Sequence, residues 1–196
     1  MKQYHFALPL IGWTCWVGPL ALAQSDFVNF EGKQTNPIRV SSDGSRLFAV
    51  NTPDARLSVF DLADPLNPGL LAEVPVGMEP VSVNSHSNNE VWVVNEVSDS
   101  VSVVSASEGI VIATLPVKDE PMDVVFANGR AFVSVGRSNK LAVFEISTRE
   151  EVASIPLKGL NPRALAVSPD GAKVYVAFAV SGNGTTIIPK EKAPVN

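Results

Sequence analysis

The sequence predicts an all-β fold built from repeated four-stranded antiparallel sheets, and three observations support this prediction. A Pro followed by an apolar segment recurs at intervals of 43, 41 and 41 residues, at Pro37, Pro80, Pro121 and Pro162. After each Pro comes an aromatic residue among small apolar residues, at 47–50, 91–94, 131–134 and 174–177. Pairs of turn-forming residues separate the apolar segments. Repeats near this length with several strands each are typical of propeller blades, so we predict a β-propeller.

The third repeat shows the strand pattern of one unit most clearly. Its four predicted strands span residues 122–126, 131–135, 141–146 and 152–157. Asn128-Gly129 separates the first two and predicts a type I′ hairpin, because both central residues of that turn take positive φ. The same place in the other repeats is held by Asp43-Gly44, Asn88-Asn89 and Asp170-Gly171. Four antiparallel strands joined by short loops form one blade.

The repeats divide the chain into blades. We expect complete blades over residues 37–79, 80–120 and 121–161, and a partial blade over 162–188 that ends after its third strand. Residues 24–36 hold a lone strand at 27–31, and residues 189–196 form a tail. A generic β-sandwich would explain the density of strands, but not why the same residue types return in phase.

The second repeat carries a resemblance to a known family. Val76-Gly77-Met78-Glu79-Pro80, followed by Val91-Trp92-Val93-Val94-Asn95 and Ser100-Val101-Ser102-Val103-Val104, resembles the YVTN-type β-propeller repeat. The best local match runs from Ser168 to Val176, and the resemblance covers roughly residues 36–188. The third repeat departs from it, since Val135-Gly136 stands where the Asn of the motif would fall. The resemblance implies an exported bacterial or archaeal protein, often seven-bladed, and names no activity.

The number of blades leaves two interpretations open. In one, the strand at 27–31 pairs with the strand at 185–188 and closes a four-bladed ring. In the other, the chain is the N-terminal part of a longer propeller whose remaining blades follow Asn196. We favour the second, because four blades is the lower limit of the usual range and an uncapped last blade would expose a sheet face and an edge.

The N-terminal 23 residues are typical of a secretory signal peptide. Lys2 supplies the positive charge, residues 6–22 are mostly apolar, and Ala21-Leu22-Ala23 gives a cleavage pattern of small residues. We therefore expect cleavage after Ala23, a periplasmic or extracellular location, and no membrane span after cleavage. The only Cys, Cys15, would leave with the signal, so thiol chemistry and haem attachment are not expected.

The charge of the chain argues against nucleic acid as a partner. The formal net charge is −5 and no basic stripe is present, whereas binding to a phosphate backbone requires one. The low charged fraction, 18%, fits a β-rich exported protein with many short turns.

Polar residues at the turns before the repeat Pro residues are the candidates for ligand binding. In a propeller these loops gather on one face, around the mouth of the channel, where they could hold a cation or a polar ligand. The residues directly before the Pro residues are Asn36, Glu79, Glu120 and Asn161, and the further candidates close by in sequence are Arg39, Asp119, Asp123 and Arg163. The favoured alternative is structural: a polar residue before Pro satisfies the geometry of the turn.

No arrangement of residues predicts catalysis, a cofactor or a metal site. His86 is the one His after residue 23 and is expected to be an exposed turn residue, so it cannot build a clustered imidazole site or a Ser-His-Asp triad. We therefore predict an exported, non-catalytic binding or interaction module for an unknown small molecule or protein. Two alternatives remain: the N-terminal part of a propeller enzyme, lactonase-like or oxidoreductase-associated, with catalytic residues beyond this chain, and a cell-surface structural protein.

Overall fold

The computed structural model describes residues 33–180, which form fourteen strands and no helix. The first sheet contains β1 (Ile38–Val40), β2 (Arg46–Asn51), β3 (Arg56–Asp61) and β4 (Gly69–Pro75). The second contains β5 (Pro80–Ser85), β6 (Glu90–Asn95), β7 (Ser100–Ser105) and β8 (Ile110–Pro116). The third contains β9 (Pro121–Ala127), β10 (Arg130–Val135), β11 (Lys140–Glu145) and β12 (Glu151–Pro156). The fourth contains β13 (Leu160–Val167) and β14 (Val174–Val180).

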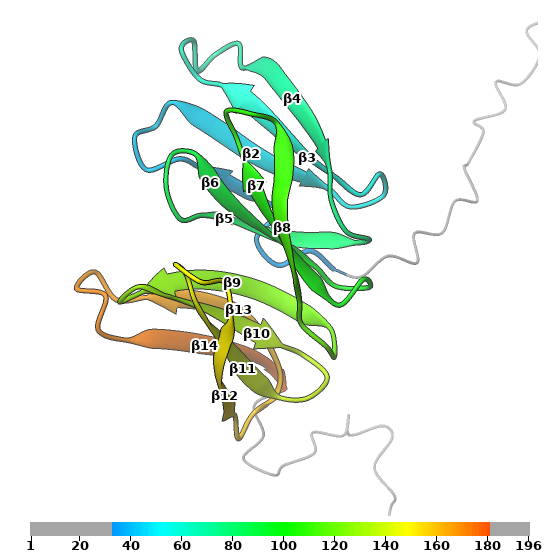
Figure 1. The fold of residues 1–196 in the computed structure, drawn as a ribbon, viewed down its shortest axis with the longest axis vertical. Coiled ribbons are helices and arrows are strands. Elements are labelled where there is room, and N and C mark those ends of the chain that lie inside the picture. Colours follow the sequence, from blue (N-terminus) through cyan, green and yellow to red (C-terminus); the bar gives the residue numbers. More distant parts are fainter. Residues whose placement is uncertain (1–32, 181–196) are drawn as a thin grey trace, which may run out of the picture. The chain divides into compact units, whose positions relative to one another are not determined.

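Each sheet is a simple antiparallel meander. Strands that follow one another in the chain are hydrogen-bonded neighbours within each sheet, as Figure 1 shows. The all-β prediction is therefore confirmed, and the arrangement is that of part of a β-propeller. None of the described residues forms a helix with the length and apolarity needed to cross a bilayer.

The hairpin between β9 and β10 has the geometry that its sequence predicts. Asn128 and Gly129 have φ values of 49° and 74°, and the flanking residues Ala127 and Arg130 pair across the turn. This prediction of a type I′ turn is confirmed. In the second sheet a side chain closes the corresponding turn, where Ser87 Oγ accepts the backbone N–H of Glu90 at 2.9 Å.

The apolar pattern predicts the fourth strands of the three complete sheets at residues 71–76, 112–117 and 152–157, and in the structure each begins one or two residues earlier. The reason is a register shift between the third and fourth strands, which recurs at Val59/Phe60, Val103/Val104 and Val143/Phe144. Such a bulge breaks the alternation of apolar and polar residues, while backbone pairing continues beyond it. The sequence pattern therefore ends at the bulge although the strand does not.

Three apolar clusters fill the spaces between consecutive sheets. Phe48, Leu57 and Val91 pack between the first and second sheets, and Val125, Leu141 and Leu165 between the third and fourth. Between the second and third sheets, the buried ring of Trp92 meets Phe126 and Phe144 edge-on, at centroid distances of 5.5 and 6.5 Å. Edge-on aromatic pairs contribute about 0.5–1.5 kcal/mol each beyond the burial of their area. Each sheet therefore depends on its neighbour for a core.

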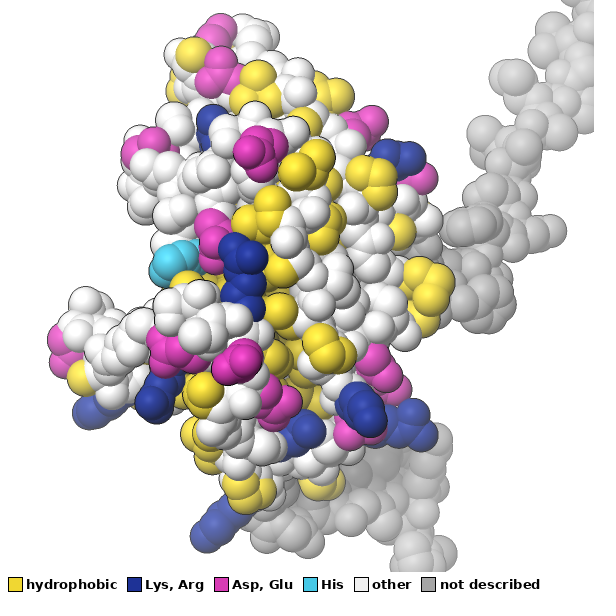
Figure 2. Space-filling view, in the orientation of Figure 1, with side chains coloured by type: hydrophobic (Ala, Val, Ile, Leu, Met, Phe, Trp, Pro, Cys, Tyr) yellow, Lys and Arg dark blue, Asp and Glu magenta, His cyan; other side chains and the backbone are white. Residues whose placement is uncertain are grey.

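The outermost strands keep apolar side chains in contact with solvent. Figure 2 shows hydrophobic side chains over β8 together with charged side chains of both signs. The exposed large hydrophobic residues on β4, β8 and β12 are Leu70, Leu71, Ile110, Ile112, Val152 and Ile155. The predicted strands at 27–31 and 185–188, the tail and the signal peptide lie outside the described residues.

Candidate binding cavity

The first strands of the four sheets, β1, β5, β9 and β13, contact one another in that order, and we call them the inner strands. The segment before β1 also joins the second sheet: Asn36 forms a parallel bridge with Ser82, and the N–H of Val83 donates to the Asn36 carbonyl at 2.9 Å. We call the end at Glu79, Glu120 and Asn161 the leading end, and the end at Ser85, Ala127 and Val167 the trailing end. The site residues fall into groups at these two ends and between them.

Asp123 ties the inner strands together. Its buried carboxylate, 1% exposed, accepts hydrogen bonds from Asn36 Nδ2 at 2.7 Å, Ser82 Oγ at 2.6 Å, the Leu165 N–H at 2.7 Å and the Val124 N–H at 2.9 Å. Burial raises the pKa of this carboxyl, and the four donors oppose that rise. Two donors on each oxygen use the acceptor capacity of the group. The sequence placed Asp123 and Asn36 among the binding residues, but in the structure they bind each other and hold three sheets and the segment before β1 together.

The turn residues at the leading end share an unusual backbone conformation. Glu79, Glu120 and Asn161, each directly before a repeat Pro, have φ values of 50°, 62° and 54°, and Asp119 has 75°. Residues other than Gly rarely adopt positive φ, except where the surrounding contacts impose it. The carbonyl of Glu79 accepts the N–H of Glu96 at 2.9 Å. These contacts favour the structural interpretation of the polar residue before Pro.

A side-chain contact that the sequence pattern did not predict recurs at this end. Asp99 Oδ1 accepts the N–H of Glu120 at 3.0 Å, and Asn139 Oδ1 accepts the N–H of Asn161 at 2.7 Å. Asp99 and Asn139 occupy equivalent turns between the second and third strands of their sheets, with φ of 49° and 50°; the equivalent residue of the first sheet is Ala55, with φ of 50°. The sequence does contain a signal for this contact, because an Asp or Asn lies about 21 residues before the turn residue that it contacts.

A small acidic pocket of about 320 Å³ lies at the leading end. Its polar lining residues are Glu96, Asp99, Asp119, Glu120 and Arg137. Desolvation raises the pKa of the Glu96 carboxyl, the charge of Arg163 opposes the rise, and the carboxylates of Glu79 and Glu120 add to it. Arg137 partly neutralises the pocket, with Nη1 3.7 Å from Glu120 Oε1.

Arg163 is a link between segments that lie far apart in the sequence. Its guanidinium donates to the carbonyl of Lys33 at 3.2 Å, and its own carbonyl accepts the hydroxyl of Ser134 at 2.6 Å. Of the eight predicted binding residues, the structure therefore groups Glu120 and Asp119 in the acidic pocket and Asn36 with Asp123. Arg39 lines a further cavity together with Asn36.

A larger cavity, of about 500 Å³, extends toward the trailing end and is lined by residues of all four inner strands. The lining residues are Asn36, Arg39, Asn84, Ser85, His86, Val125, Phe126, Leu165, Ala166 and Val167. Arg39 Nε is buried and has no hydrogen-bond partner among the described residues. Asn84 uses one amide hydrogen in a 2.9 Å bond to the Val124 carbonyl. Of the predicted binding residues, Arg39 and Asn36 belong to this cavity.

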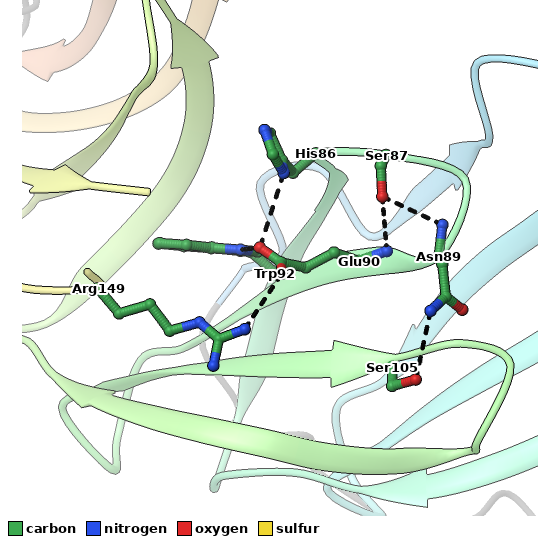
Figure 3. Close-up of polar contacts among 7 residues, drawn as sticks. All are labelled: His86, Ser87, Asn89, Glu90, Trp92, Ser105 and Arg149. Atoms are coloured by element: carbon green, nitrogen blue, oxygen red, sulfur yellow. Dashed lines mark hydrogen bonds and ion pairs between the residues drawn. The ribbon is translucent and has the colours of Figure 1, made fainter. Parts of the chain in front are cut away.

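His86 joins the cavity to a polar cluster between the second and third sheets. Glu90 is the centre of this cluster: it accepts Trp92 Nε1 at 2.9 Å and Arg149 Nη2 at 3.2 Å, and its Oε1 lies 3.7 Å from His86 Nδ1 (Figure 3). The His86 ring also packs against Phe126, at 5.2 Å between centroids. His86 occupies the predicted turn and is 37% exposed, but its side chain has definite partners. Within residues 33–180, no three His, Cys, Asp or Glu residues are grouped so that they could hold a metal ion.

Comparison with known proteins identifies the fold and no family. No family model matches the chain, and no curated protein matches it. A solved structure of Kuenenia stuttgartiensis hydrazine synthase is similar, with a TM-score of 0.69, 26% identity, and coverage of 81% of this chain and 46% of that one. A proposed 6-phosphogluconolactonase from Bacteroides uniformis has a TM-score of 0.63 and 20% identity over 76% of this chain and 52% of that one.

A third similar structure is a protein of unknown function from Desulfotomaculum acetoxidans, with a TM-score of 0.66 and 16% identity over 76% of this chain and 50% of that one. The chain thus spans about half the length of the structures that it matches. The two matches at 20% and 16% identity establish the propeller-like fold alone.

Proposed function

We propose that this chain supplies part of an exported β-propeller of the YVTN type that binds a small polar molecule between its inner strands without converting it. The observation that carries the proposal is the cavity of about 500 Å³ to which all four inner strands contribute. Its volume lies in the range of roughly 300–1,000 Å³ that is usual for small-molecule sites, and its mostly polar wall suits a polar ligand. The Asp123 hydrogen bonds hold that wall in place before a ligand arrives.

The wall of the cavity supports binding rather than catalysis. Among the described residues that line it, His86 is the only imidazole and none carries a carboxylate. Nucleophilic catalysis uses a nucleophile held within hydrogen-bond distance of a base, and the Glu90 carboxylate lies farther than that from His86 Nδ1, at 3.7 Å. The likeness to a proposed lactonase motivates the rival function, a propeller enzyme with reacting groups beyond these residues.

Export is proposed from the N-terminal sequence. The charged, apolar and small-residue regions of residues 1–23 follow the order of a secretory signal. The intact mass of the protein recovered from fractionated cells tests this part. We expect the loss of residues 1–23 and recovery outside the cytoplasm; an uncleaved cytoplasmic protein would contradict it.

Thermal unfolding with a panel of sugars, amino acids, organic acids and nucleosides tests binding. A ligand that binds only the folded protein raises the melting temperature. We expect at least one compound to do so with the native chain and with Ala177→Trp, but not with Ala166→Trp. Ala166 lines the cavity, whereas Ala177 is an exposed residue of the same sheet that does not. No shift with any compound, or equal shifts with both variants, would contradict the proposal.

The same variants separate binding from catalysis. Lactones of the panel's organic acids are incubated with the protein, and acid release is followed by titration. Turnover that Ala166→Trp abolishes and Ala177→Trp preserves would replace the binding function with an enzymatic one.

A further inference from the structure

The acidic pocket at the leading end and the cavity toward the trailing end differ in the charged side chains that line them. The carboxylates at the leading end belong to Glu79, Glu96, Asp99, Asp119 and Glu120. Among residues 33–180, the lining of the cavity toward the trailing end contains two basic residues, Arg39 and His86, and no acidic one. The Glu90 carboxylate lies 3.7 Å from His86 Nδ1, whereas Arg39 forms no ion pair among the described residues. An anion is therefore favoured in the cavity, where Arg39 attracts it, over the acidic pocket.

Arg39 is the polar group on the cavity wall that most needs a partner. Its Nε is buried without a hydrogen bond among residues 33–180. A guanidinium is always charged, and its planar N–H groups match the paired oxygens of a carboxylate or phosphate. A buried charged donor without an acceptor is costly, so an acceptor that enters the cavity gains more there than at an exposed arginine.

The remaining wall sets the kind of molecule that fits. Phe126, Val125 and Leu165 provide a small apolar surface on a wall that is mostly polar. The Ser85 hydroxyl and the second amide hydrogen of Asn84 are additional donors. A ligand with one compact anionic group and a small organic body uses both parts of this wall.

Resting on the proposed function, we propose that the cavity binds the oxyanion group, carboxylate or phosphate, of a small organic acid, with Arg39 as its principal partner and His86 as the second. The apolar residues hold the organic body. Arg39 thus favours anionic over neutral ligands, because a neutral molecule leaves its Nε without an ionic partner.

Trp92 is a built-in reporter of this cavity. The centroid of its ring lies 5.5 Å from that of Phe126, which lines the cavity. Its Nε1 donates to the Glu90 carboxylate, which lies beside His86. The sequence contains three Trp residues, and the other two are Trp13 and Trp16. In the full chain carrying Trp13→Phe and Trp16→Phe, tryptophan fluorescence therefore reports on Trp92 alone.

The test is a fluorescence titration of that chain at constant ionic strength with succinate, inorganic phosphate, glucose 6-phosphate and neutral glucose. We expect a saturating change with at least one of the anions and none with glucose. Succinate against the two phosphates distinguishes the two kinds of oxyanion, and inorganic phosphate against glucose 6-phosphate shows whether the organic body contributes. Arg39→Gln should weaken the anion affinity at least about tenfold, and His86→Asn about threefold.

Arg130→Gln is the matched control, because Arg130 is an exposed arginine that lies 3.9 Å from Glu145 and outside the cavity lining. Its affinity should equal that of the parent chain. Equal weakening by Arg130→Gln and Arg39→Gln would overturn the proposal, since it would show a non-specific charge effect. Melting temperatures of both variants, measured without ligand, identify any loss of affinity that comes from unfolding, and Arg39→Lys, which keeps the charge, should retain part of the affinity.

Failure of this inference differs from failure of the proposed function. A neutral compound that binds in the panel and is blocked by Ala166→Trp, with no anion binding, overturns the anion proposal and leaves the binding function standing. Absence of binding by every compound overturns both.

Discussion

The leading end of the inner strands and the cavity toward the trailing end differ in how closely the repeats agree with one another. At the leading end the same backbone contacts recur from sheet to sheet: the residues at Ala55, Asp99 and Asn139 each accept a backbone N–H through their carbonyl, from Val76, Val117 and Leu157 at 2.8–2.9 Å. Toward the trailing end the cavity residues differ in every strand. A repeat imposes common geometry where backbone groups must be paired, and it allows side chains to diverge where they are not. We infer that function lies where the repeats differ.

The largest effect on stability is expected for Asp123, whose carboxylate joins three sheets and the segment before β1. Asp123→Ala leaves four donors without their acceptor, so we expect a loss of about 3–5 kcal/mol in the free energy of unfolding. Urea unfolding followed by Trp92 fluorescence measures it. Asp123→Asn keeps one acceptor oxygen and should lose less. A loss below about 1 kcal/mol for the Ala variant would mean that the carboxylate does not hold the inner strands together.

The next effect concerns the hairpin at the trailing end of β9. Gly129 has φ of 74°, and a Cβ there would meet nothing closer than Glu145 Oε1 at 3.9 Å. Gly129→Val should therefore cost about 1–2 kcal/mol through backbone strain alone. Gly69→Val is the control, because Gly69 lacks a positive φ and a Cβ there has no neighbour within 4 Å. Equal losses in chemical denaturation would show that strain in the turn is not the cause.

At the leading end, a substitution of Ala55 can give the first sheet the kind of turn residue that the second and third sheets have. Ala55 has φ of 50° but lacks the side-chain oxygen that Asp99 and Asn139 carry in the equivalent turns. Ala55→Asn should raise the free energy of unfolding by about 0.5–1 kcal/mol, because Asn tolerates positive φ better than Ala. Ala55→Val, a β-branched residue at the same φ, should lower it. If Asn also lowers stability in the thermal melt, the equivalence of the three turns is wrong.

The smallest effect is a dependence on pH. The pKa of Glu96 is raised above its ordinary value of 4.5, first by desolvation, so the folded state holds this proton more tightly than the unfolded state. Stability must then fall as pH rises from about 4.5 through the raised folded pKa. Glu96→Gln should remove that fall, and it should also relieve the repulsion from Glu79 and Glu120. Melting temperatures between pH 4 and 8 that stay parallel for the two proteins would contradict the raised pKa.

Local patterns were sufficient for the elements themselves. The alternation of apolar residues and turn pairs such as Asn128-Gly129 predicted four strands per repeat, because side-chain direction in a strand and φ at a turn depend on near neighbours. The predicted starts of the fourth strands were wrong by one or two residues, because the bulges interrupt the alternation without ending the backbone pairing. The contacts of Asp99 and Asn139 were visible in principle as a repeated Asp or Asn.

What the sequence by itself determined about this protein is therefore the repeat, its strands and its turns, which follow from interactions over a few residues. Only the tertiary structure decided which polar residues meet. Asp123 contacts residues 87, 41 and 42 positions away in the chain, and Arg149 reaches Glu90 across 59 positions. Such contacts exist because the sheets pack through their apolar faces, and that packing brings Arg39 and His86 to the wall of one cavity.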